Sequence, residues 1–554
     1  MADILSSLDE QQRLAAQCLV GSVAIHAGAG SGKTRTITHR IAYGVAEGRF
    51  QPNRTLAVTF TNRAAGELRS RLAQLDAHGV QVRTFHSAAL RQLRHFYPQV
   101  FGKNLPSVIS SKAHLVSQAA ASCKVSIDRE MVRDLSSEIE WAKSNIVSPD
   151  MYRALTDNRV SSLTVIEVAH VYEAYMQLLD QNNSIDFEDV LLLTLAVMKN
   201  NPDVAAQVHQ QYHHFTVDEF QDVSPVQFEL LTAWLGTRQD VCVVGDVAQT
   251  IYSFAGATSE YLQNFPRYFP QAQVFEITQS YRSTPEIVTF ANRIGAQESK
   301  ITLKSVRKSG SKVEIASFSD DESEAKKVAS SILKLIESGS RAEEVAVLFR
   351  MNSQSEPLES ALSDLGIPFT LRGTERFFER SEVRNAILNL RATNSELVAS
   401  TLSATVRQVL SGIGWQATMP LSGRAEIEKW ESLESIVRLS TDFEREHSTA
   451  TVVEFVGHLD ARAQLEHAPA AQAVTLTSIH SAKGLEWAHV FLIGCSEGLL
   501  PISYAKNISA VAEERRLMYV AVTRAQDSLS LSWAKARNQG TSAFRKPSQF
   551  LPDH

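Results

Sequence analysis

The glycine-rich stretch AGAGSGKT constrains the fold of this chain more than any other feature, because it directly follows the apolar run Val23–Ile25. Glycines let the backbone turn so tightly that successive N–H groups point at phosphate oxygens. A helix beginning near Lys33 adds the positive end of its dipole; Lys33 then reaches the β and γ phosphates, and the Thr34 hydroxyl binds Mg²⁺. The predicted phosphate cradle consists of Ala27, Gly28, Ala29, Gly30, Ser31, Gly32, Lys33 and Thr34. The stretch predicts a nucleoside triphosphate site but does not distinguish a kinase, a GTPase or a motor. Its alternative is a glycine-rich turn with an exposed lysine.

Two carboxylates, Asp218 and Glu219, follow the short apolar segment Phe215–Val217. Ligands bind beyond the carboxyl ends of strands in open parallel α/β sheets. We therefore expect Asp218 to hold Mg²⁺ and Glu219 to orient and deprotonate an attacking water. Adjacent acids alone are more often a solvated pair, but the glycine-rich loop favours the functional interpretation.

A third apolar segment, VCVVGD, precedes Gln249. A glutamine just beyond a strand can sense a γ-phosphate through hydrogen bonds that are lost after hydrolysis, and we expect this role for Gln249. On spacing alone, an ordinary polar loop residue is an equal alternative.

The composition limits the class of protein, the number of domains and the cellular compartment. The 554 residues, 44% hydrophobic and with a net charge of −6, are typical of a globular protein of three to four domains. The four cysteines are far apart and form no CxxC pair, which favours a reducing compartment without disulfides or zinc. The sequence shows neither a signal-peptide pattern nor an apolar run near the roughly 20 residues of a membrane helix, so we expect a cytoplasmic protein.

Strand-like segments recur in the second half as KVEIASF, EVAVLFR, AVTLTSIH, HVFLIG and DSLSLSW, separated by helical stretches. They predict a second open α/β layer that lacks a glycine-rich loop of its own. Such a layer can bring arginines to the charge that develops on a transferred phosphate. Arg282 in QSYRSTPEI and Arg524 in YVAVTRAQD are the candidates, and a surface ion pair is the alternative for each.

Ten short motifs occur in an order that resembles superfamily 1 DNA helicases of the UvrD, Rep and PcrA type. They span residues 8 to 525: LDEQQ, AGAGSGKT, VTFTNRAAGEL, VRTFHSAAL, VDEFQD, VGDVAQTIYSF, QSYRS, VLFRMNSQS, TSIHSAKGLEW and EERRLMYVAVTRA. The segment TIYSFAGA and the compact C-terminal half are further similar to a shortened UvrD-type helicase of actinobacteria. The resemblance implies two RecA-like P-loop parallel-sheet domains with helical insertions, the cofactors ATP and Mg²⁺, and 3′→5′ movement along single-stranded DNA in repair or replication.

The resemblance also implies how the nucleotide is held. Gln12 resembles the glutamine that reads the adenine edge, and Glu486 resembles the acid that contacts the ribose. Arg35 and Tyr281 resemble the pair that sandwiches the adenine, because a guanidinium plane and a phenol ring can both stack on a purine. The two arginines named above match those that contact the γ-phosphate.

Aromatic side chains are expected to stack on the bases of single-stranded DNA, where each stacked base contributes roughly 1–3 kcal/mol. The matching aromatic positions are Phe60, Phe85, Phe187, Tyr252 and Phe254. The matching positions for backbone and phosphate contacts are Thr61, Asn62, Thr84, His86, Asn352 and His480. Core packing is the alternative for each aromatic ring. The two histidines lack a second ligand three or four residues away, so we expect no metal there.

Three features depart from the resemblance. Phe254 and Ala255 stand where the family often has tryptophan and arginine, and Ser280 replaces a common asparagine. The stretch 381–473 is short for the accessory domain that the family inserts there, which leaves unwinding and partner binding open.

The chain is expected to divide into four parts. The first lobe comprises 1–90 and 186–278, and a helical insert covers 91–185. The second lobe comprises 279–380 and 474–554, and a reduced helical insert covers 381–473.

We expect single-stranded and tailed duplex DNA as partners, together with DNA-repair proteins, no membrane, and a monomer with a dimer as the alternative. Three other functions stay open. They are a single-strand-dependent ATPase translocase with weak unwinding, a motor subunit of a helicase–nuclease complex, and a P-loop kinase or GTPase. The second lobe with its arginines argues against the last of these.

Overall fold

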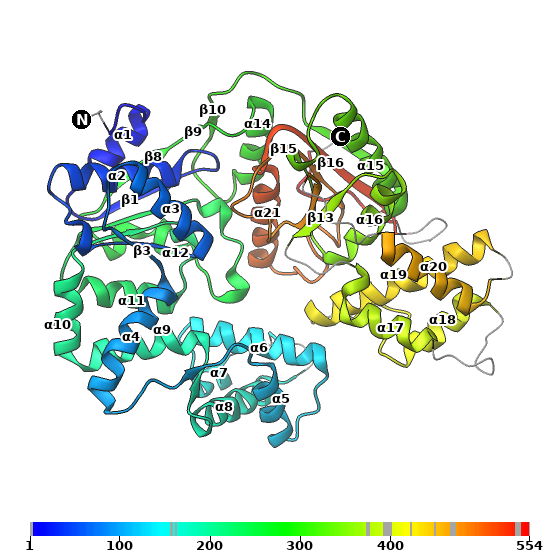
Figure 1. Ribbon diagram of the computed structural model, residues 1–554, viewed down its shortest axis with the longest axis horizontal. Helices are drawn as coiled ribbons and strands as arrows, with labels where there is room; N and C mark the ends of the chain where they lie inside the picture. Colours follow the sequence, from blue (N-terminus) through cyan, green and yellow to red (C-terminus); the bar gives the residue numbers. More distant parts are fainter. Residues whose placement is uncertain are drawn as a thin grey trace. The chain divides into compact units, whose positions relative to one another are not determined.

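The computed structural model describes residues 4–155, 159–160, 163–372, 377–391, 401–420, 424–447, 450–465, 472–537 and 544–552. The chain forms two compact units (Figure 1). The first comprises Met1–Arg282 and Gly295–Val306, and the second comprises Ser283–Ile294 and Arg307–His554. Among the described residues, no helix is both long enough and apolar enough to cross a membrane.

The first unit is built on a six-stranded parallel sheet in the order β3-β2-β6-β7-β1-β8. The strands are β1 (Val23–Ala27), β2 (Thr55–Thr59), β3 (Gln81–Thr84), β6 (His214–Val217), β7 (Val241–Gly245) and β8 (Gln273–Ile277). Successive residues of β1 enter opposite apolar clusters, Ala24 on one face and Val23 and Ile25 on the other. Both faces are therefore covered, which explains why the strand is almost wholly apolar.

Helices cover this sheet. They are α1 (Glu10–Gln17), α2 (Lys33–Ala46), α3 (Asn62–Gln74), α4 (Phe85–Phe101), α9 (Phe187–Asn200), α10 (Pro202–Gln211), α11 (Pro225–Leu235), α12 (Glu260–Gln263) and α13 (Phe265–Tyr268). The short 3-10 turns η2 (Phe220–Asp222), η3 (Val247–Gln249) and η4 (Ser253–Ala255) follow the carboxyl ends of β6 and β7. A two-stranded sheet pairs β9 (Gln279–Ser280) with β10 (Lys304–Ser305).

A helical insertion with its own apolar core lies between α4 and α9. It contains α5 (Ala113–Ser122), α6 (Arg129–Ser144), α7 (Pro149–Arg153) and α8 (Val165–Gln181). Its core includes Val116, Ile139 and Tyr175. The short pair β4 (Ser107–Val108) and β5 (Ser184–Ile185) joins the two ends of the insertion.

The second unit contains another six-stranded parallel sheet, in the order β11-β16-β15-β12-β14-β13. The strands are β11 (Glu314–Asp320), β12 (Val345–Phe349), β13 (Phe369–Arg372), β14 (Val474–Ser478), β15 (Trp487–Leu492) and β16 (Ala525–Ala536). The helices of this lobe are α14 (Pro285–Gly295), α15 (Asp321–Glu337), α16 (Ser355–Asp364) and α21 (Ile508–Val522). The expected class, two parallel-sheet domains with helical insertions, is confirmed. The sequence analysis missed β13, a four-residue edge strand.

A second helical insertion contains α17 (Ser381–Arg391), α18 (Leu402–Ser411), α19 (Arg424–Glu446) and α20 (Val452–Leu465). Its apolar core includes Val406, Leu433 and Phe455. A buried ion pair between Arg438 of α19 and Glu356 of α16, 2.6 Å long, attaches the insertion to the lobe. Parts of the predicted segment 381–473 lie outside the described residues, and the four predicted domain boundaries stay a proposal.

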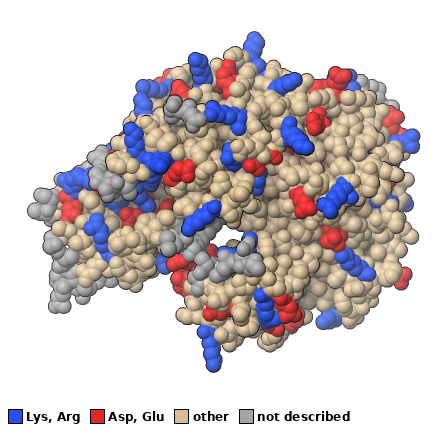
Figure 2. All heavy atoms as spheres, turned by 180° about the vertical axis from the view of Figure 1, so that it is seen from behind, with Lys and Arg blue, Asp and Glu red and all other residues tan. Residues whose placement is uncertain are grey.

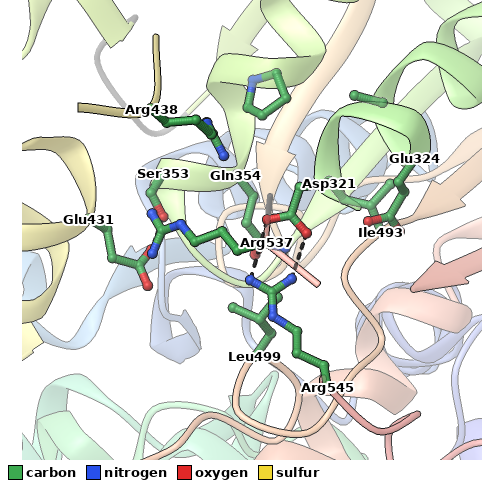
Figure 3. A pocket seen from close by; sticks show the side chains of 12 residues that line it. Asp321, Glu324, Ser353, Gln354, Glu431, Arg438, Ile493, Leu499, Arg537 and Arg545 are labelled. Atoms are coloured by element: carbon green, nitrogen blue, oxygen red, sulfur yellow. Dashed lines mark hydrogen bonds and ion pairs between the residues drawn. The ribbon is translucent and has the colours of Figure 1, made fainter. Parts of the chain in front are cut away.

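A small pocket lined mainly by charged and polar residues lies in the second unit beside this attachment (Figure 3). Glu324 of α15 lines it and accepts hydrogen bonds from the Gly494 backbone N–H at 3.0 Å and the Ser532 hydroxyl at 2.5 Å. Figure 3 also shows the ion pair between Asp321 and Arg545. Burial and the nearby Asp321 carboxylate raise the pKa of Glu324 to about 7.

Replacing Glu324 with glutamine tests this buried carboxyl. The folded state retains a proton that the unfolded chain releases near pH 4.5, so raising the pH through this window costs stability. We expect the free energy of unfolding of the unmodified protein to fall, relative to Glu324→Gln, between pH 4.5 and about 7 and to stay level above it. Denaturant unfolding across this range measures the difference. Glu322→Gln, on the exposed side of the same helix, is the control and should give a flat difference.

Candidate nucleotide and DNA site

The glycine-rich loop connects β1 to α2 at the carboxyl edge of the first sheet. Gly30 and Gly32 have φ angles of +71° and +77°, in the left-handed region that favours glycine. Gly32 directly precedes the first residue of α2, so the loop delivers the helix N-terminus to the site. The Lys33 ammonium lies over the loop and donates to the Ala27 carbonyl at 3.4 Å.

The segment that carries Tyr281 and Arg282 packs directly on this loop within the first unit. The Tyr281 backbone N–H donates to the Gly30 carbonyl at 2.9 Å. A Cβ at position 30 would lie 2.7 Å from the Arg282 Cβ and 2.8 Å from the Ser280 hydroxyl. Tyr281 and Arg282, whose motif QSYRS is far from the glycine-rich loop in the chain, therefore lie at the phosphate cradle.

Asp218, directly after β6, lies beside Thr34. The Thr34 hydroxyl donates to the Asp218 carboxylate at 3.1 Å, which brings together the two predicted Mg²⁺ ligands. Burial and the adjacent Glu219 carboxylate raise the pKa of Asp218 to about 7, while the Lys33 charge opposes the shift. A buried carboxylate and a hydroxyl beside a phosphate cradle form a donor set that fits Mg²⁺, because this ion prefers oxygen ligands and phosphate.

A relay of polar side chains continues from Glu219, a non-glycine residue with φ of +52°. The Gln221 amide donates to the Glu219 carboxylate at 2.5 Å and accepts from the Asp246 backbone N–H at 3.0 Å. The Gln249 amide in turn donates to the Asp246 carboxylate at 2.7 Å. Gln221 was not singled out from the sequence, although DEFQD places this glutamine two positions beyond Glu219, the predicted general base. The relay connects the predicted general base to the predicted γ-phosphate sensor.

The residues expected around the adenine also lie near the loop. Gln12 is buried, and its amide donates to the Ser31 carbonyl at 2.9 Å. Arg35 donates to the Ser7 carbonyl at 2.7 Å. Tyr281 is 41% exposed and its hydroxyl donates to the Asp9 carboxylate; burial and this hydrogen bond raise its pKa to about 12. The tyrosine is therefore a neutral ring available for stacking.

The second unit holds the remaining predicted residues. Arg524 is buried and donates to the backbone carbonyls of Val520 at 3.0 Å and Leu485 at 3.2 Å. The neighbouring Glu486 is exposed and accepts from the Gln526 amide at 3.0 Å. Arg524 and Glu486 therefore lie on adjoining segments, and their nucleotide roles stay predictions. Asn352 begins the 3-10 turn η6 (Asn352–Gln354) and His480 follows β14; both are partly exposed.

Two of the predicted DNA contacts, Phe85 and Thr84, are buried. Phe85 is 1% exposed, and its ring stacks on that of Trp234 with centroids 5.9 Å apart. Phe60, partly exposed, meets the edge of Phe85 at 6.1 Å. In the structure Phe85 is a core residue, so the core-packing alternative holds for this ring and only Phe60 of the pair presents surface.

The other aromatic positions are more accessible. Phe254 is 43% exposed and lies edge-on to the partly exposed Tyr252, with centroids 6.1 Å apart. Phe187 is 52% exposed, and the His86 ring stacks on it at 3.8 Å. These rings present apolar surface in the same unit as the phosphate cradle.

The predicted backbone contacts lie at helix starts. Thr61 accepts from the Ala64 N–H at 3.1 Å and caps α3, whose first residue is the exposed Asn62. Thr84 accepts from the Ser87 N–H at 3.1 Å and caps α4. Both hydroxyls serve as helix caps and the Thr84 side chain is buried, so the DNA contacts of these residues stay predictions.

Charge is mixed on the surface. Figure 2 shows one face on which Lys and Arg side chains are interspersed with Asp and Glu. The chain as a whole carries a net charge of −6, so its net charge does not attract a phosphate backbone. DNA binding by this chain therefore depends on local contacts.

A phosphate cradle at the carboxyl edge of a parallel sheet, with a buried aspartate opposite its threonine, defines a P-loop nucleoside triphosphatase. Comparison with protein families narrows this class. The UvrD/REP helicase N-terminal domain matches residues 8–270, and the UvrD-like helicase C-terminal domain matches residues 275–427 and 416–536. The chain belongs to the UvrD/REP helicase family.

Relatives cover nearly the whole chain. It is 43% identical to the ATP-dependent DNA helicase UvrD2 of Mycobacterium tuberculosis, over 99% of this chain and 81% of the relative. It is 30% identical to DNA helicase II of Haemophilus influenzae, over 100% of this chain and 88% of the relative. It is 29% identical to the ATP-dependent DNA helicase PcrA of Leuconostoc citreum, over 99% of this chain and 85% of the relative.

Gly30→Ala tests the cradle. A Cβ at this left-handed position costs about 1–2 kcal/mol and collides with Arg282, so the loop must shift, and we expect ATP affinity to fall about 5- to 30-fold. Titration with a fluorescent ATP analogue measures the change. Gly66→Ala in α3, where a Cβ meets no atom within 4 Å, should bind normally. Unchanged affinity of Gly30→Ala would contradict the assignment.

Proposed function

We propose that this chain is an ATP-dependent DNA helicase that moves 3′→5′ along single-stranded DNA and acts in DNA repair or replication. The contact between Thr34 and Asp218 beside the phosphate cradle carries the proposal. It occurs in the same unit as the exposed aromatic rings, in a member of a helicase family. Polarity and pathway rest on the resemblance.

In this proposal the cradle binds the triphosphate of ATP, and Thr34 and Asp218 hold Mg²⁺. The ion, when bound, neutralises charge on the phosphate oxygens. Glu219 accepts the proton of the attacking water, and Gln249 senses the γ-phosphate. The Gln221 relay then passes the state of the nucleotide to the turn that precedes Tyr252 and Phe254. The aromatic rings hold bases by stacking, which accepts any sequence.

Arg282, Arg524 and Glu486 complete the proposed nucleotide contacts, with the two arginines on the γ-phosphate. Single-stranded and tailed duplex DNA are the proposed substrates. DNA-repair proteins are proposed as partners, and the active form is proposed to be a monomer.

A second candidate is a single-strand-dependent ATPase translocase that unwinds weakly. The buried pair between Arg438 and Glu356 favours it, because this pair fixes α19 of the short insertion to the second lobe. Removing one partner of this pair would leave the other charge largely buried and unpaired, which is costly.

Lys33→Ala tests the motor site. We expect DNA-stimulated ATP hydrolysis to fall by more than about 100-fold, because the substitution removes the fixed positive charge that the glycine-rich loop itself presents to the phosphates. Affinity for single-stranded DNA should stay within about twofold, because the aromatic rings are untouched. Lys199→Ala, at an exposed ion pair with Glu229, is the matched control and should behave as the unmodified protein. Normal turnover by Lys33→Ala would refute the site.

Strand separation distinguishes the two candidate functions. Unwinding of a 3′-tailed duplex, and not of a 5′-tailed one, is expected of a 3′→5′ helicase. Stimulated ATP hydrolysis with little separation of either duplex would favour the translocase. Preference for the 5′ tail would overturn the proposed polarity.

A further inference from the structure

The C-terminal turn of α6, residues 143–145, contacts the segments that carry two separate exposed aromatic rings. Lys143 binds the start of α9, where Phe187 lies. Ser144 and Asn145 pack against Gly256, two residues beyond Phe254. We name this turn the α6 brace.

The first arm of the brace is an ion-pair cluster. Lys143 is 1% exposed, and its ammonium lies 2.7 Å from Asp186 and 2.7 Å from Asp189. These two aspartates form the capping box of α9: the Asp189 N–H donates to Asp186 at 2.9 Å, and the Asp186 N–H donates to Asp189 at 3.1 Å. The Tyr175 hydroxyl also donates to Asp186, at 2.9 Å. Lys143 thus pairs with both acids that fix the first turn of this helix and offsets part of their charge.

Phe187 lies between these two aspartates in the chain, so the cluster determines where its ring stands. The His86 ring stacks on it at an angle of 13°. Burial and the nearby Lys112 lower the pKa of His86 to about 4, so the imidazole is neutral at pH 7. Lys112 also pairs with Glu188 at 2.5 Å. One side of Phe187 is therefore supported, while 52% of the residue stays exposed.

The second arm of the brace is a close backbone contact. Gly256 has a φ of +93°, and a Cβ there would lie 2.8 Å from the Ser144 Cβ and 2.8 Å from the Asn145 amide nitrogen. The Asn145 amide is itself fixed by a 2.8 Å hydrogen bond to the Trp141 carbonyl. Gly256 is the C-cap of the 3-10 turn that contains Phe254, so the position of this turn depends on the close contact with α6.

We propose that the α6 brace sets the positions of Phe187 and Phe254 as stacking platforms for single-stranded DNA, with Lys143 as a positioning residue. The inference rests on the proposed function and adds to it a part played by the helical insertion. In this proposal the helical insertion, through α6, holds the two segments that carry Phe187 and Phe254.

The first arm is tested by the binding of a single-stranded oligonucleotide that carries 2-aminopurine, because stacking quenches the fluorescence of this base. We expect Lys143→Met to weaken binding about tenfold, the effect of losing one stacked base. Lys143→Arg retains the charge and should recover most of the affinity. ATP affinity without DNA should not change. Lys199→Met, which removes an exposed lysine from α9 itself, is the control and should bind normally.

A double-mutant cycle separates positioning from general damage. If Lys143 acts through Phe187, then Lys143→Met with Phe187→Ala should bind no more weakly than Phe187→Ala alone. Fully additive losses, or normal binding by Lys143→Met, would overturn the first arm.

Gly256→Ala tests the second arm, the contact of Gly256 with Ser144 and Asn145. This variant also tests the proposal if Lys143→Met does not fold. It should weaken binding about tenfold, and the loss should disappear in a Phe254→Ala background. Gly102→Ala, also at a left-handed position but with no atom within 4 Å, is the control. If Phe187→Ala and Phe254→Ala both bind normally, the proposed DNA surface fails and the brace with it. If they bind weakly while Lys143→Met and Gly256→Ala bind normally, the brace alone is wrong.

Discussion

The parallel pairing of β6 with β7 and of β7 with β1 is the constraint on which the nucleotide site depends. Parallel strands end at the same edge, so the loops after all three meet there. Thr34 of the first loop reaches Asp218 of the second, and Gln249 of the third is joined through Gln221. A reversed strand would send its loop to the opposite edge and separate these groups.

Buried polar contacts then connect this edge to the exposed aromatic rings. Inside the protein the low dielectric strengthens hydrogen bonds and makes an unpaired group costly, so such networks hold defined positions. The Gln221 amide links the Glu219 carboxylate to the Asp246 backbone N–H, and the Lys143 ammonium pairs with two aspartates at the start of α9. Both arrangements join segments that are far apart in the chain, and we propose that they hold the neighbouring site residues in position.

Much of the fold and of the phosphate cradle could be predicted from local sequence. Glycines at positions 30 and 32 indicate left-handed backbone, and apolar runs ending in acids indicate buried parallel strands. The role of Phe85 could not, because a phenylalanine in TFHS is equally suited to a core or to a base. Only the Trp234 ring, far away in the chain, decides that it is buried. β13 was missed because four residues at a sheet edge carry little periodicity.

The sequence by itself determined the chemistry available: a phosphate cradle, a pair of acids, two arginines and a set of aromatic rings in a family order. The tertiary structure decided which of these groups meet. It joined Tyr281 and Arg282 to Gly30, placed Gln221 between Glu219 and Asp246, and fixed α9 through Lys143. The reason is physical: motifs reflect local backbone geometry, whereas burial and long-range contacts depend on how strands pair and helices pack.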